Sequence, residues 1–214
     1  MKKITDIYEE YKIAPLLRLH QIRVAAVATM ICDSLKIPVD KDSIVKACLF
    51  HDMGNIIKFN LNDFPEENGS HDLKYWKQIQ VEFIEKYGND EHSASVKIAR
   101  ELNLPQVIID LVDSVKPSFV LDGSIINGSD WAKKICNYAD QRVTPHGVVS
   151  IEERNSEARE RYKNHPHAFS EENSHLFLSN IKEIEKQIFS HSKIKPEDIN
   201  DESVVVYFEK LKDF

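Results

Sequence analysis

Four polar residues of this 214-residue chain stand where the surrounding pattern predicts burial. His20 and His51 each lie on an apolar helical stripe, Asp52 follows His51 directly, and Asp140 lies in the segment NYADQRV. Imidazoles and carboxylates are rarely buried unless they are hydrogen-bonded, paired or bound to a metal. Taken singly, each has an ordinary explanation as a hydrogen-bonded core histidine or a solvated aspartate. Together, two imidazoles and two carboxylates suit a divalent transition metal such as Mn²⁺, Fe²⁺ or Zn²⁺.

The elements that must position these residues are helices. The chain has only 6 Gly and 8 Pro, and its apolar residues recur at helical spacing. The pattern predicts helices over about 14–36, 74–87, 91–102, 105–115, 150–163, 172–190 and 201–212, and two more that begin at caps near 40–42 and 129–130 and end near 54 and 141. A loop is expected over 55–73. We therefore predict an all-α fold in which three separate helices supply the four residues, as in metal sites of helical bundles.

Composition limits the classes of partner. The formal net charge of −7 gives no support for a nucleic-acid surface. No apolar run approaches the roughly 20 residues that a membrane helix needs, and the charged N-terminus does not resemble a signal peptide. The 3 cysteines form no CxxC pair, so a cysteine zinc site is not expected. We expect a cytoplasmic protein with no membrane or nucleic-acid partner.

The ordered set of residues resembles a known family. His20 within LHQIRVAAVA, His51-Asp52 within ACLFHDMGN and Asp140 within NYADQRV resemble the H…HD…D signature of the HD superfamily of metal-dependent phosphohydrolases. A second His-Asp dipeptide, at 71–72, lies in a predicted loop and is not preceded by an apolar helix, so we do not assign it to the signature. The resemblance covers about residues 14–150 and implies an HD-type helical bundle. It also implies that the four residues bind a divalent ion, whether Mn, Fe, Zn, Co, Ni or Mg.

The resemblance also suggests catalytic residues. Asp52 is expected to bind the metal and to help position the attacking hydroxide. His92, at the start of a predicted helix, resembles the extra histidine of dinuclear family members. Because 105–120 contains no second histidine, we expect one tightly bound metal. His92 is then either a weaker second-site ligand or a hydrogen-bond partner of the attacking water, and a surface position remains its ordinary explanation.

A phosphorylated substrate would also need a cationic contact. Arg142, two residues after Asp140, is the predicted phosphate contact, because a guanidinium can bind two phosphate oxygens at once. Arg154, Arg23 and Lys58 are further candidates. Each of these cations has an ordinary explanation as a solvated surface residue.

These features predict a metal-dependent phosphohydrolase that acts on a small phosphorylated substrate, with a nucleotide expected. Whether it is a phosphomonoesterase or a phosphodiesterase stays open. The alternatives are a non-catalytic nucleotide-binding sensor and an interaction module on an HD fold. We assign 1–164 to the HD-type domain and 165–214 to a C-terminal helical extension. The extension has apolar positions at Leu176, Phe177, Ile181, Ile184 and Ile188, and is expected to pack on the core or on a second subunit, so a homodimer stays open.

Overall fold

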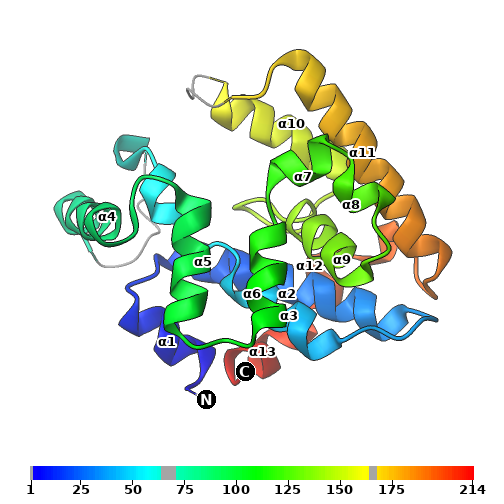
Figure 1. Ribbon diagram of the computed structural model, residues 1–214, viewed down its shortest axis with the longest axis horizontal. Coiled ribbons are helices and arrows are strands. Elements are labelled where there is room, and N and C mark those ends of the chain that lie inside the picture. Colours follow the sequence, from blue (N-terminus) through cyan, green and yellow to red (C-terminus); the bar gives the residue numbers. More distant parts are fainter. Residues whose placement is uncertain (1, 64–70, 164–167) are drawn as a thin grey trace.

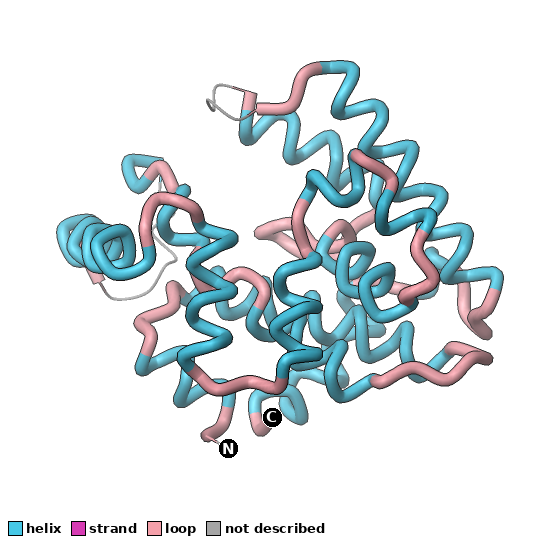
Figure 2. Tube along the Cα trace, in the orientation of Figure 1, coloured by secondary structure: helices cyan, strands magenta, loops and turns pink. Residues whose placement is uncertain are grey.

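The computed structural model describes residues 2–63, 71–163 and 168–214, and this part of the chain is helical without a strand, as predicted (Figures 1 and 2). The α-helices are α1 (Ile4–Glu10), α2 (Pro15–Ser34), α3 (Lys41–Phe50), α4 (Leu73–Tyr87), α5 (Glu91–Glu101), α6 (Gln106–Ser114), α7 (Pro117–Leu121), α8 (Ser124–Asn127), α9 (Trp131–Asp140), α10 (Ile151–Tyr162), α11 (Glu171–Ser190), α12 (Asp201–Val204) and α13 (Phe208–Lys212). Short 3₁₀ helices are η1 (Asn55–Lys58), η2 (Leu61–Asp63), η3 (Pro196–Asp198) and η4 (Val205–Tyr207). No helix among these residues is both long and apolar enough to cross a membrane.

Side-chain caps determine where several helices begin. Asp40 accepts a hydrogen bond from the backbone N–H of Ser43, and Asp130 accepts from two N–H groups in the first turn of α9. Ser150 and Glu153 form a reciprocal capping box at the start of α10. The predicted helix over 201–212 is instead divided into α12, η4 and α13. The change to 3₁₀ geometry coincides with the run of β-branched valines, which fit a helix poorly.

Helix α2 lies at the centre of the packing that positions the predicted ligands. It packs against α3 and α9 and also contacts α12 and α13. Ala25, Ala26 and Ala28 are completely buried, and their small side chains let neighbouring helices approach α2 closely. As a result, the C-terminal ends of α3 and α9 meet the first half of α2.

The turn after α3 is packed tightly against α5. The backbone N–H of Gly54 donates to Ser95 Oγ at 2.9 Å, and Ser95 Oγ in turn donates to Glu91 O. A Cβ atom at Gly54 would lie 2.3 Å from Glu91 O and 2.6 Å from Ala94 Cβ. Glycine is therefore required by the close approach of two backbones.

The C-terminal segment packs on the rest of the molecule. Helix α11 contacts α7, α8, α9 and α10, while α13 contacts α1 and α2. Ile4 N–H donates to Phe214 O at 2.9 Å, so the two ends of the chain lie together, as Figure 1 shows. Of the apolar positions predicted to pack, Leu176 is 45% exposed, and the other four are buried. The predicted domain boundary at 164/165 lies outside the described residues.

Arg142 ties the end of α9 to this C-terminal segment. Its guanidinium is buried and donates to the carbonyl oxygens of Val149, Pro196 and Ile199 and to the hydroxyl of Tyr138. Four of the five N–H donors of an arginine are thus used within the protein. The structure therefore corrects the predicted phosphate contact, because Arg142 holds backbone carbonyls together and does not present its charge to a ligand.

We expect Gly54→Ala to lower the free energy of unfolding by about 1–3 kcal/mol, the usual cost of overpacking a core. The added methyl group must push α5 away from the turn that carries the His-Asp pair. Urea denaturation of the purified variant measures the effect. A urea midpoint equal to that of the wild type would show that α5 moves aside without any loss of stability.

We expect Arg142→Ala to destabilise the protein by about 3–5 kcal/mol, the usual cost of breaking a buried charged network, while the folded fraction keeps its metal. Arg142→Lys should recover only part of the stability, since an ammonium group cannot reach the same acceptors. Urea denaturation and elemental analysis measure the two quantities. Unchanged stability together with weaker substrate binding would restore the phosphate-contact hypothesis.

Candidate metal centre

The structure brings the four predicted ligands together. One ligand atom from each of His20, His51, Asp52 and Asp140 can be chosen so that all four lie within 4.8 Å of one another. His20 Nε2 lies 3.2 Å from Asp140 Oδ1 and 3.5 Å from Asp52 Oδ2. His51 Nε2 lies 3.4 Å and 3.5 Å from the same two oxygens. The two nitrogens and two oxygens therefore surround one small space.

Each residue reaches this space from a different part of the helical frame. His20 comes from α2, His51 ends α3, Asp52 lies in the turn that follows, and Asp140 is the last residue of α9. The side chain of His51 is 2% exposed and that of Asp52 is 21% exposed. His51 is thus the buried member of the cluster, whereas His20, Asp140 and Asp52 are partly exposed.

The orientation of His51 is fixed by its other ring nitrogen. Nδ1 lies 2.8 Å from the carbonyl oxygen of Cys48, which can only accept, so Nδ1 carries a hydrogen and donates it. Nε2 then points toward the carboxylates, and it is buried without a hydrogen-bond partner among the described residues. A buried nitrogen of this kind, oriented by a backbone carbonyl, is the usual arrangement of a metal-binding histidine.

The electrostatics of the cluster favour a protonated imidazole at His51 and an ionised carboxylate at Asp140. Burial lowers the pKa of His51, but the carboxylates of Asp52 and Asp140 outweigh burial and raise that pKa to about 9. Burial raises the pKa of Asp140, but the neighbouring imidazoles of His20 and His51 outweigh burial and hold that pKa well below its usual range. Without a metal, protonated imidazole therefore balances the carboxylate charge.

The spacing of the donor atoms fits a divalent ion. Ligand atoms about 2.0–2.2 Å from a metal lie about 2.8–3.6 Å from their neighbours, with octahedral geometry at the short end and tetrahedral geometry at the long end. The nitrogen–oxygen separations of 3.2–3.5 Å fall within this range. The set of two nitrogens and two carboxylate oxygens is also one that Mn²⁺, Fe²⁺ and Zn²⁺ accept.

Gln21 supports the cluster and was missed from the sequence. It is completely buried, and its Oε1 accepts a hydrogen bond from the backbone N–H of Asp52 at 3.3 Å. This contact links the helix that carries His20 to the turn that carries Asp52. The only signal in the sequence was a polar residue beside His20 on a helix with many apolar residues, which periodicity alone does not distinguish from an exposed glutamine.

His92 is not one of the four clustered residues. It lies in the first turn of α5, and its Nε2 is 3.1 Å from Asp113 Oδ1 of α6. The pair links two neighbouring helices. A catalytic role for His92 therefore stays a prediction.

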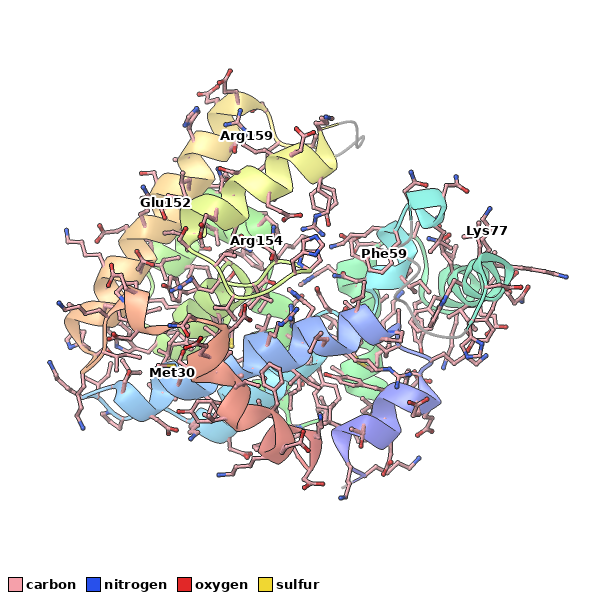
Figure 3. All side chains as sticks on the ribbon, turned by 180° about the vertical axis from the view of Figure 1, so that it is seen from behind. Met30, Phe59, Lys77, Glu152, Arg154 and Arg159 are labelled. Carbon is pink, nitrogen blue, oxygen red and sulfur yellow. The ribbon has the colours of Figure 1, made fainter. Side chains whose placement is uncertain are left out.

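The remaining cationic candidates differ in how their charge is used. Arg154 donates to Glu157 at 3.3 Å, and Arg23 donates to the carbonyl oxygen of Pro145 at 3.1 Å. The ammonium of Lys58 lies 3.6 Å from Glu91 Oε1. Figure 3 labels Arg154 on α10 and Phe59, the residue that follows Lys58.

We expect metal binding to release about one proton per ion at about pH 7.5, because the metal must displace the proton of His51. The apparent affinity should then rise about tenfold per pH unit until the pH reaches the pKa of about 9. Titration calorimetry with Mn²⁺ in buffers of different ionisation enthalpy counts the protons. His146→Ala, which changes an exposed histidine, is the matched control. Binding without proton release would contradict the assignment of His51.

Comparison with known proteins agrees with this geometry. A family model described as the HD domain matches residues 18–120, which include His20, His51 and Asp52, and Asp140 lies beyond the match. A comparison with curated proteins finds no match, and a comparison with solved structures finds none either. The ordered signature, the helical fold and the clustered histidines and aspartates all agree with the family match. Residues 18–120 therefore match the HD domain, and the clustered ligand atoms are consistent with the metal-binding signature of that family.

Proposed function

We propose that this chain is a phosphohydrolase that acts on a small phosphorylated substrate, with a nucleotide as the expected class. The HD domain and the His/Asp cluster indicate a metal-dependent hydrolase and a divalent ion. The observation that carries the proposal is the convergence of two imidazoles and two carboxylates around one space, with three of the four side chains partly exposed.

In this proposal His20, His51, Asp52 and Asp140 hold the ion. A bound divalent ion supplies Lewis acidity toward a phosphoryl oxygen and makes hydroxide available near neutral pH. The carboxylate of Asp140 is oriented for binding the ion. Gln141 Nε2 donates to its Oδ2 at 2.8 Å, and its Oδ1 faces the two histidines.

Asp52 is suited to a second task. Its Oδ2 faces the two histidines, whereas its Oδ1 has no hydrogen-bond partner within the described ranges. The side chain of Asp52 is 21% exposed. Asp52 would accept a proton from an attacking water molecule through Oδ1, and its Oδ2 would help to hold the ion.

The test is phosphate release from a panel of nucleotides, and from p-nitrophenyl phosphate and its diester, with added Mn²⁺. We expect Asp52→Asn to lower kcat by about 10²–10⁴-fold, the usual contribution of a general base, in addition to any loss of metal. Asp42→Asn changes an exposed aspartate in the first turn of α3 and should leave kcat unchanged.

The outcome separates the alternatives. Metal-dependent turnover that disappears in Asp52→Asn supports the proposal. Tight nucleotide binding by the wild type without turnover would instead identify a sensor. Equal turnover by Asp52→Asn and Asp42→Asn would remove Asp52 from the mechanism.

A further inference from the structure

The segment that carries Lys58 is held rigidly beside the metal centre. Helix η1 begins directly after the His-Asp turn and ends at Lys58. Gln80 on α4 donates through its side-chain amide to the carbonyl oxygens of Ile56 at 2.7 Å and Phe59 at 3.0 Å. These bonds fix the backbone on both sides of Lys58, so the position of its side chain does not depend on a flexible loop.

Of the candidate cations, Lys58 is the one whose charged group is least engaged in contacts with the rest of the protein. The buried guanidinium of Arg142 has four acceptors, Arg23 is bonded to a backbone carbonyl, and Arg154 is paired with Glu157. Within the described part of the chain, the ammonium of Lys58 has only the ion pair with Glu91, at 3.6 Å. This separation exceeds that of a good hydrogen bond, and the side chain is 27% exposed. The ammonium therefore keeps Glu91 as an ion-pair partner and has N–H donors that no hydrogen bond among these residues occupies.

Lys58 lies near the His-Asp turn, because its ion-pair partner Glu91 packs with its backbone oxygen against Gly54 of that turn. Burial lowers the pKa of Lys58, but Asp52, then Tyr162, Glu91 and Asp140, outweigh burial and raise it, so the ammonium stays charged. Two of these groups are predicted metal ligands. When a divalent ion neutralises them, the charge of Lys58 is left with Glu91 alone. An anion bound beside the metal would then meet the ammonium without competition from those two carboxylates.

We propose that Lys58 binds the phosphate group of the substrate at the metal centre, with Glu91 holding its side chain in place. The inference rests on the proposed function, because it names the residue that recognises the phosphoryl group of that reaction. An ammonium donates to one or two phosphate oxygens as a compact charge, while the ion takes another oxygen.

The experiment compares Lys58→Met, Lys58→Arg and Lys77→Met in the Mn²⁺-loaded protein. Lys77 is exposed on α4, where its ammonium donates to Asn62 Oδ1 at 3.3 Å, so Lys77→Met controls for the lost charge (Figure 3). The readouts are metal content, binding of inorganic phosphate by calorimetry, and KM and kcat for the best substrate of the panel. We expect Lys58→Met to weaken phosphate binding and raise KM by about 10- to 100-fold, the range of a charge-assisted hydrogen bond. Lys58→Arg should recover part of the loss, and metal content should not change.

The results distinguish this proposal from the proposed function. Phosphate binding that depends on Lys58 in a protein without turnover would support the role of Lys58 and refute the hydrolase. Turnover with the same KM and phosphate affinity in Lys58→Met and wild type would support the hydrolase and overturn the role of Lys58. Loss of metal from Lys58→Met, or no phosphate binding by the wild type, would also overturn it.

Discussion

Two carboxylates and two imidazoles can be buried in a protein only if they are buried together, as partners of one another. A single buried carboxylate would cost several kcal/mol, roughly as much as the whole protein gains on folding. Here Asp52 and Asp140 each face both His20 and His51, so every charge has two partners of opposite sign or a metal. The arrangement requires α2, α3 and α9 to meet at one point. The alanines of α2 make such close packing possible, and the ends of α3 and α9 supply the polar groups.

The part of the structure that follows from periodicity was predictable from the sequence. The stripes that contain His20 and His51 gave the helices and the inward direction of both imidazoles, and the ordered signature added Asp52 and Asp140. Short elements were not predictable in this way. Helices α1, α7 and α8 have seven, five and four residues, too few for a helical period to stand out. Their formation depends on tertiary contacts that no local pattern reveals.

The role of a cation was the hardest feature to predict. Arg142 and Lys58 both lie within six residues of a metal-binding motif, and a guanidinium is the stronger phosphate ligand on chemical grounds. The deciding facts are non-local. Arg142 donates to carbonyl groups more than fifty residues away in the sequence. Gln80, in contrast, binds the backbone beside Lys58 and leaves the lysine side chain accessible. Gln21 illustrates the same limit, because its hydrogen bond to the turn depends on how α2 packs against α3.

The anchoring of Arg142 has a consequence for the order of events during protein synthesis. All four clustered residues have been synthesised once the ribosome has passed Asp140. The carbonyls of Pro196 and Ile199, which satisfy the guanidinium two residues after Asp140, are made more than fifty residues later. Until they emerge, Arg142 has only the hydroxyl of Tyr138 and the carbonyl of Val149 from its final set of acceptors. The end of α9 can therefore take its final set of contacts only after the C-terminal segment has been synthesised.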